Sequence, residues 1–450
     1  MGGLEHPDTG DVRNVPAGRC IVPAMRTNRV SGLILAAVLS IGCGSAPPVE
    51  GLKAFVGATL VDGESTPDAV IVVRDGRVEA SGSAASVAIP AGAERVELSG
   101  KFVTPGLIVG HGHVGASLGL ESGPDVYTRE NLIDQLGLYA LYGITTVVSL
   151  GGDGPEAIRL RDEQLAPGLQ RARIFAAGSV VVGDTPDAAL AMVNQNADMN
   201  VDFIKIRVDD NLGSSKKMSR EVYQAVIKQS HERGLPLAAH LYYYDDAKSL
   251  LEDGVDFIAH SIRDRDVDAE LAQAIKDAAV CLCPTLTREV STFVYEDVPE
   301  FFEDPFFLKY ADPQVLEQLK APERQARIRA SKSAQQYKVG LDTALRNLKA
   351  LADAGVKIVF GTDTGQPGRF QGYFEHMELE LMAKAGLSPE QILRSATSDA
   401  AECLGLNEIG SLEAGKWADF VVLDENPLED IRNMRTIDSV WMAGEKIPAN

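Results

Sequence analysis

Four of the seven histidines directly follow short apolar segments of the sequence. His111 and His113 are separated by one residue, so on an extended chain both side chains point to the same side and can bind one ion. His240 and His260 each follow a later apolar segment. A single histidine in such a place is more often a core residue than a ligand. Four in equivalent places indicate a metal site.

Asp363 and Lys205 extend this set. Asp363 follows the apolar segment 357–360, and Lys205 lies inside the apolar segment 202–206. A buried ammonium group is costly, and Lys205 could instead form a salt bridge with Asp202 or Asp209. Together with the histidines, Asp363 predicts a site for Zn(II), with Mn(II), Fe(II) or Co(II) as alternatives.

The candidate ligands lie in a series of apolar segments that alternate with helical patterns. The segments expected to be strands are 106–109, 145–149, 173–177, 202–206, 237–239, 256–259, 280–283 and 357–360. This alternation predicts an α/β fold, a (β/α)8 TIM barrel over residues 105–407. Such barrels carry their chemistry at the carboxyl ends of the strands, where these ligands lie.

Both ends of the chain differ from this middle part. Residues 51–104 and 408–450 contain β-rich runs with glycine turns, such as Asp75-Gly76, and predict one small β-sandwich domain formed by both chain ends. Within the barrel, the aromatic-rich stretch 287–348 is long for one connection. We expect a lid-like insertion there, with extra helical packing as the alternative.

The N-terminal segment predicts export. Arg26 and Arg29 precede an apolar run at 33–39 that is too short to span a bilayer, so residues 1–42 are interpreted as a signal segment, with Met25 as an alternative start. Cys43 is the expected lipidation site, and 43–50 the tether. The expected location is a membrane-anchored lipoprotein or, after ordinary cleavage, a periplasmic protein.

Composition and cysteine content limit the kind of protein and the partners that it can have. A composition of 45% hydrophobic residues, with Gly 42 and Pro 22, is that of a globular protein, and the net charge of −21 argues against nucleic acid or anionic lipid as a partner. Cys281 and Cys283 would share one face of a strand, too constrained to bridge each other. We expect both, and Cys403, to be buried small apolar residues.

Four motifs in this sequence are similar to those of the amidohydrolase superfamily, in particular its imidazolonepropionase-like and prolidase-like metal-dependent hydrolases. The motifs are 103–113 (VTPGLIVGHGH), 143–147 (GITTV), 361–365 (GTDTG) and 415–419 (GKWAD). The resemblance covers roughly residues 52–446. One position departs from the family pattern, because Val109 stands where the family usually has an aspartate.

The resemblance implies a centre of two divalent metal ions. His111, His113 and Asp363 would bind one ion, and His240 with His260 the other. Lys205 would bridge them as a carbamate formed with CO2. The implied reaction is hydrolysis of a C–N bond by metal-bound hydroxide, with Asp363 transferring the proton to the leaving nitrogen.

The expected substrate is a small amide that carries a free carboxylate, either a dipeptide or an N-acyl amino acid. Tyr242 is the candidate for the oxyanion or the carboxylate, and Arg263 for the carboxylate. Their alternatives are loop packing for Tyr242 and a surface pair with Asp264 or Asp266 for Arg263.

Two other classes of function stay open. The first is a deaminase with one metal ion, or a cyclic-amide hydrolase, of the same superfamily. The second is an inactive, lipid-anchored binding protein. The expected partner is a small molecule, with membrane contact only through the lipid anchor, and the oligomeric state, a homo-oligomer included, stays open.

Overall fold

Short parallel strands separated by helices build the larger part of the protein. The structure, a computed structural model, describes residues 49–448. One parallel sheet contains β6 (Leu107–Gly112), β9 (Ile144–Ser149) and β10 (Arg173–Ala176). A second parallel sheet contains β11 (Ile204–Arg207), β12 (Leu237–His240), β13 (Phe257–Ala259) and β14 (Cys281–Cys283).

Isolated parallel bridges connect these two sheets into a ring. Val181 pairs with Ile206, Leu282 with Ile358, and Gly112 with Thr364. Residues 357–364 thus take the eighth place, through bridges and hydrogen bonds such as Gly110 N to Phe360 O at 2.8 Å rather than as a continuous strand. The fold is the predicted (β/α)8 barrel. Seven of the expected strands form with nearly the expected bounds, because their apolar runs are buried on both faces.

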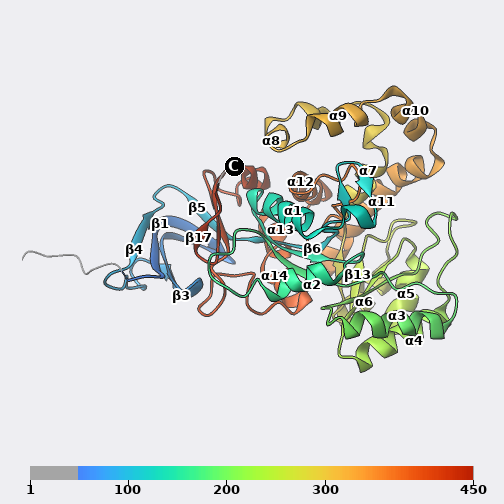
Figure 1. Cartoon of the computed structure of the whole chain (residues 1–450), viewed down its shortest axis with the longest axis horizontal. Helices are drawn as coiled ribbons and strands as arrows, with labels where there is room; N and C mark the ends of the chain where they lie inside the picture. The colour runs from blue at the N-terminus through green and yellow to red at the C-terminus, as the bar shows by residue number, and fades with distance from the viewer. Residues whose placement is uncertain (1–48, 449–450) are drawn as a thin grey trace, which may run out of the picture. The chain divides into compact units, whose positions relative to one another are not determined.

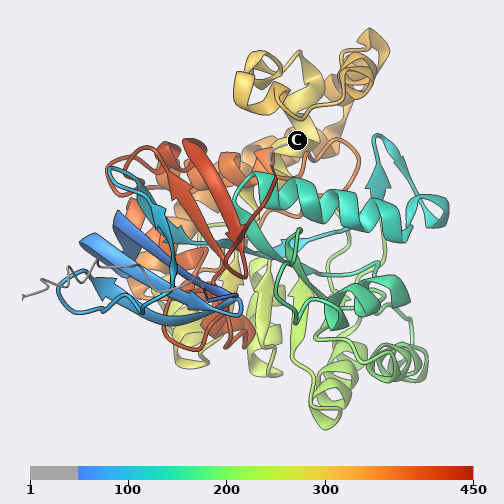
Figure 2. The same cartoon turned by 60° about the vertical axis from the view of Figure 1, so that its left-hand side comes forward.

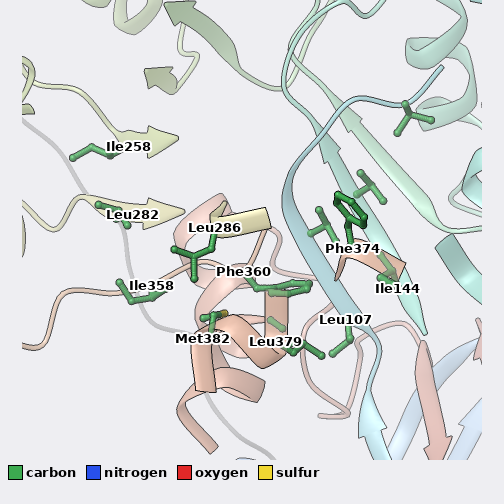
Figure 3. Close-up of a cluster of buried hydrophobic side chains, with 14 of the residues drawn as sticks. Leu107, Ile144, Ile258, Leu282, Leu286, Ile358, Phe360, Phe374, Leu379 and Met382 are labelled. Atoms are coloured by element: carbon green, nitrogen blue, oxygen red, sulfur yellow. The ribbon is translucent and has the colours of Figure 1, made fainter. Parts of the chain in front are cut away.

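The helices that follow the strands pack around this ring (Figure 1). They are α1 (Arg129–Leu141), α2 (Pro155–Asp162), α3 (Pro186–Asp198), α4 (Arg220–Glu232), α5 (Tyr244–Glu252), α6 (Ala269–Asp277), α7 (Leu286–Phe293), α11 (Lys332–Ala354), α12 (Tyr373–Ala385), α13 (Pro389–Ser395) and α14 (Ser398–Leu404). Thr128 caps α1 and Thr185 caps α3, each accepting a hydrogen bond from a backbone amide of the first turn. Figure 3 shows side chains of several strands meeting Leu379 and Met382 of α12 in one apolar cluster.

Strands from both ends of the chain share one sheet. It has eight strands, in the order β17-β16-β15-β5-β1-β2-β3, with β4 beside β1. Their bounds are β1 (Leu52–Asp62), β2 (Glu64–Arg74), β3 (Arg77–Ser83), β4 (Glu94–Glu97), β5 (Phe102–Pro105), β15 (Phe420–Leu423), β16 (Ile437–Met442) and β17 (Glu445–Lys446). Phe55 contacts both Phe420 and Trp441, at ring-centroid distances of 4.9 and 4.7 Å, so the two halves of the sheet fold over a common core. Figure 2 shows the blue N-terminal and red C-terminal strands side by side.

A buried ion pair joins this sheet to the barrel. Arg173, at the start of β10, contacts Asp419 with an Nε to Oδ2 distance of 2.6 Å, and both side chains are almost fully buried. Trp417 covers the Arg173 guanidinium at 4.5 Å. The GKWAD motif therefore attaches the sheet to the amino-terminal ends of the barrel strands.

The expected insertion has two parts. Residues 294–330 form an arm of short helices that projects from one end of the barrel (Figures 1 and 2). Its elements are η2 (Val294–Glu296), η3 (Glu300–Glu303), α8 (Pro305–Leu308), α9 (Pro313–Leu319) and α10 (Pro322–Ala330). Residues 287–293 belong to α7, and residues 332–348 belong to α11, whose buried face packs on the barrel wall. Extra helical packing is therefore present in this stretch, and the lid-like role of the arm stays a prediction.

The cysteine prediction needs a correction. Cys281 of β14 and Cys403 of α14 form a disulfide across 122 residues, with a Cα to Cα distance of 6.1 Å, whereas Cys283 is free and buried as expected. The periodicity of β14 excluded a bridge between Cys281 and Cys283, but it contained no information about which helix packs behind the strand.

The predicted signal segment, Cys43 and the start of the tether lie outside the described residues. Among residues 49–448, no helix is both long and apolar enough to cross a membrane.

Replacing Cys403 with Ser should lower the free energy of unfolding by about 2–5 kcal/mol, because the bridge closes a long loop of the unfolded chain. Denaturant unfolding of both proteins measures the difference. The same comparison in excess thiol is the control, since the difference should then largely vanish. Equal stability under oxidising conditions would contradict the bridge.

Candidate metal centre

His111, His113 and Asp363 form the first group of the site. Both histidines lie at the end of β6, and one ligand atom from each of the three residues falls within 4.8 Å of the others. His113 Nε2 lies 2.7 Å from Asp363 Oδ1, and His111 Nε2 lies 3.6 Å from the same oxygen. The backbone amide of Asp363 donates to the carbonyl of His111 at 2.8 Å, which fixes the carboxylate beside β6.

The second group, Lys205, His240 and His260, adjoins the first. Lys205 Nζ lies 3.3 Å from His111 Nε2. The His260 ring lies 4.7 Å from the His111 ring and 4.1 Å from the His240 ring. The six candidate ligands predicted from the sequence therefore meet in one cluster at the carboxyl ends of the strands. Only His113 and His240 retain partial exposure.

Neighbouring groups orient two of the histidines. His113 Nδ1 donates to the Gly151 carbonyl at 2.9 Å, and His260 Nδ1 lies 2.6 Å from the Thr285 hydroxyl. His260 Nε2 is buried without a hydrogen-bond partner among residues 49–448. A buried imidazole nitrogen left unpaired beside other ligands is what a metal ion would satisfy, so the donor set fits a divalent ion.

Burial controls the charge of this cluster. It lowers the pKa of His240 to about 4 and shifts the pKa of His111 and His260 well below the usual range. It also lowers the pKa of Lys205 to about 8. For Asp363, burial acts in the opposite direction, but Arg369 and the two histidines outweigh it and hold the pKa low. His111, His240 and His260 are therefore neutral near pH 7, as metal binding requires.

Asp209 is a site residue that the sequence analysis considered only as a partner of Lys205. Its carboxylate accepts from His240 Nε2 at 3.0 Å and from Arg207 Nε at 3.0 Å. Hydrogen bonds from His240 and Arg207 lower its pKa although burial opposes them. Asp202 pairs instead with Arg161. Within residues 49–448 no carboxylate forms an ion pair with Lys205, so neither expected salt bridge is present.

Two buried glutamates of α12 support the segments that carry the ligands. Glu375 accepts from the hydroxyls of Thr362 and Thr364, on both sides of Asp363. Glu378 accepts from the backbone amides of Leu286 and Thr287, next to Thr285. Burial raises the pKa of Glu375 to about 7 and of Glu378 to about 8. In the sequence they look like ordinary helix residues, so only their burial reveals this role.

A cavity of about 460 Å³ opens in front of the cluster. Three arginines line it, Arg207 at the end of β11, Arg288 on α7 and Arg369 after the eighth segment. Arg288 is 7% exposed and packs on the Tyr337 ring at 4.2 Å. Its Nη1 lies 3.2 Å from Glu289 and its Nε 4.0 Å from Asp363, and this Nε makes no hydrogen bond among residues 49–448. Arg369 donates to the carboxylate and the carbonyl of Asp363. This cavity can receive an anionic group.

Tyr242 and Arg263 do not line this cavity, which corrects the prediction that they contact substrate. Arg263 is buried, lies 2.8 Å from Glu289 and covers the Tyr242 ring at 4.7 Å. Its alternative, a surface pair with Asp264 or Asp266, is also not formed. The reason is that α7 and α11 cover the loops after β12 and β13, so both side chains become part of the protein interior.

The profile of the amidohydrolase family matches residues 102–447. The chain belongs to this family. Its expected aspartate position holds Val109, which is fully buried in the apolar core. A 5-methylthioadenosine/S-adenosylhomocysteine deaminase from Bacillus cereus is 36% identical over 91 residues, which is 19% of this chain and 21% of the deaminase. The match thus spans about a fifth of the deaminase.

Solved structures share the fold over most of the chain. A protein from Bifidobacterium longum assigned as a prolidase has a TM-score of 0.71 and 27% identity, covering 89% of this chain and 96% of its own. A Xaa-Pro dipeptidase with bound methionine has a TM-score of 0.72 and 22% identity, covering 88% of this chain and 100% of its own. With the family match, these structures show that the chain has the amidohydrolase fold over most of its length.

Replacing Asp209 with Asn should weaken metal binding about 10- to 100-fold, because His240 loses the carboxylate that orients its ring. Competition with a chelator of known affinity measures this. Asp184→Asn, at an exposed aspartate, is the matched control and should bind metal like the parent protein. Equal affinity of the two variants would exclude the orienting role.

Proposed function

We propose that this amidohydrolase holds two divalent metal ions, Zn(II) being the expected one, and cleaves an amide of a small molecule that carries a free carboxylate. The observation that carries the proposal is the continuity of the cluster, in which Lys205 lies beside His111 while His260 contacts both His111 and His240. One group of three ligands and one pair therefore share a common centre.

Lys205 is proposed as the bridge between the two ions. Its Nζ would bond to the carbon of CO2 and release a proton, which leaves a carbamate with one negative charge and two oxygens. The absence of an acidic partner for Lys205 among the described residues supports this assignment. The nearby imidazoles leave the cluster short of negative charge, which a carbamate would supply.

When bound, the two ions supply polarisation of the scissile carbonyl and activation of water as the nucleophile. Asp363 is placed to accept a proton at its carboxylate and to deliver it to the leaving nitrogen. Arg369 fixes that carboxylate from one side and His113 from the other. Arg288, rather than Arg263, is proposed to bind the substrate carboxylate, because it lines the cavity and its Nε makes no hydrogen bond within residues 49–448.

A deaminase with one ion is the second candidate, and the local identity to the Bacillus deaminases favours it. The residues after His240 argue against it, because Leu241, Tyr242 and Tyr243 supply no carboxylate for proton transfer. An inactive binding protein is less consistent with the site, since a barrel without activity has no need for all six ligands.

We also propose that the chain works outside the cytoplasm, at a membrane through Cys43 or in the periplasm. The disulfide between Cys281 and Cys403 supports this location, because such bridges persist in oxidising compartments.

Metal content tests the proposal. Protein prepared with Zn(II) and bicarbonate should contain about two ions per chain by elemental analysis. Lys205→Ala should lose metal and amidase activity, with partial rescue of activity by a short carboxylate, whereas Lys216→Ala, at an exposed lysine, should lose neither. One ion per chain in the parent protein would favour the deaminase, and none would favour the inactive barrel.

Arg288→Met should lower kcat/KM about 10- to 100-fold on amides with a free carboxylate, because a charged hydrogen bond to substrate is lost. The neutral amide analogues should change little. Arg265→Met, at an exposed arginine, is the control and should leave both classes unchanged. Equal losses on both classes for Arg288→Met would exclude a carboxylate-binding role.

A further inference from the structure

A second cavity of about 270 Å³ lies next to the metal cavity. Gln366 and Arg369 line both cavities, so the two meet at the segment that follows Asp363. The arm contributes Phe307, Tyr310 and Val315 to the wall of the second cavity. The arm, which is not one of the helices of the (β/α)8 barrel, thus forms part of its wall, and the cavity lies beside the candidate metal centre.

Several polar groups of this second cavity are already hydrogen-bonded. Gln135 Oε1 accepts from the Gly115 amide and from Gln371 Nε2, both at 2.6 Å. Gln135 Nε2 donates to the Ser117 carbonyl at 2.6 Å and to Asn131 Oδ1 at 3.0 Å. Two carboxylates of the lining, Asp134 and Asp312, are exposed to solvent, and the other side chains that a ligand group would meet are mainly apolar.

Those apolar side chains come from three separate elements. Leu138 belongs to α1, Phe307 and Val315 to the arm, and Phe370 to the segment before α12. The Phe307 ring lies 4.8 Å from the Phe370 ring, which holds the arm in place at this wall. A volume of about 270 Å³ is enough for a phenyl ring with a short alkyl chain.

The metal cavity has the opposite character. Arg207, Arg288 and Arg369 line it, and Asp363, which Arg369 already pairs, is the one acidic residue of its lining within the described chain. Divalent ions would add to the positive charge. A substrate ammonium group next to the scissile carbonyl would therefore face like charges without a free carboxylate as partner.

From these two cavities we infer the substrate class, an inference that rests on the proposed amide hydrolysis. The substrate is an N-acyl amino acid with no free ammonium group. Its carboxylate binds at Arg288, its amide lies at the metal cluster, and its apolar acyl group extends past Arg369 into the second cavity. Dipeptides, the other class expected from the sequence, are poorer substrates because they carry an α-ammonium group.

Two amides that differ only in that ammonium group test the inference. 3-Phenylpropanoyl-leucine is phenylalanyl-leucine without its amino group, and acetyl-leucine lacks the phenyl group. For the metal-loaded full chain, kcat/KM should be at least about tenfold higher on the phenylpropanoyl compound than on either of the others. The same series on glycine and on proline repeats the comparison with other carboxylate-bearing groups.

Ala311→Phe would fill the second cavity from the arm. It should lower kcat/KM about tenfold on 3-phenylpropanoyl-leucine and leave acetyl-leucine nearly unchanged. Val339→Phe, at an exposed position of α11, is the matched control. Activity on acetyl-leucine also reports whether each variant is folded, and Leu138→Ala, which enlarges the same cavity, should relieve the Ala311→Phe loss in the double variant.

The outcomes separate this inference from the proposed function. If the metal-loaded chain hydrolyses none of these amides, the proposed function fails. If phenylalanyl-leucine is cleaved as well as or better than the phenylpropanoyl compound, amide hydrolysis stands and the N-acyl class is wrong. If Ala311→Phe affects acetyl-leucine and phenylpropanoyl-leucine equally, the second cavity does not hold the acyl group.

Discussion

The rest of the structure depends on the gathering of four histidines and a lysine around one carboxylate. Burial favours the neutral forms of His111, His240, His260 and Lys205, and neutral imidazoles are what a divalent ion needs. The ring of parallel strands and bridges supports this burial, because the ligands lie on or directly after segments whose backbones are hydrogen-bonded to their neighbours. His113 donates to the Gly151 carbonyl and His240 to the Asp209 carboxylate, and His260 bonds to the Thr285 hydroxyl, so these hydrogen bonds direct the histidine rings.

The end of the barrel opposite the candidate metal centre binds the eight-stranded sheet. Arg173 and Asp419 pair at the amino-terminal ends of the strands, where the sheet from both chain ends attaches. An ion pair so deeply buried costs desolvation, and its value lies in fixing one orientation of the two parts. The disulfide between β14 and α14 adds a covalent restraint to the outer wall of the barrel. These features stabilise the fold without touching the cavity.

The proposed specificity rests on side chains from the barrel and from the arm. Helix α7 contributes Arg288, the segment after Asp363 contributes Arg369, and the arm adds apolar side chains beyond them. The metal cavity, which three arginines line, and the second cavity adjoin each other, because Arg369 lines both of them. A substrate with an anionic group at one end and an apolar group at the other matches these two cavities. The candidate metal ligands line the same cavity as the arginines.

The sequence by itself determined the barrel and its six candidate ligands. The positions of the ligands can be predicted from short segments of sequence. Apolar runs become strands, and the residue after each run lies at the carboxyl end of its strand, where such barrels carry their active site. Arg288 and Arg263 show the limit of such rules. Both follow barrel strands, but only the packing of α7 and α11 decides that Arg263 is enclosed with Glu289 while Arg288 faces the cavity. The pairing of Cys281 with Cys403 and the second cavity were also decided by the tertiary structure alone, because each depends on contacts between elements far apart in the chain.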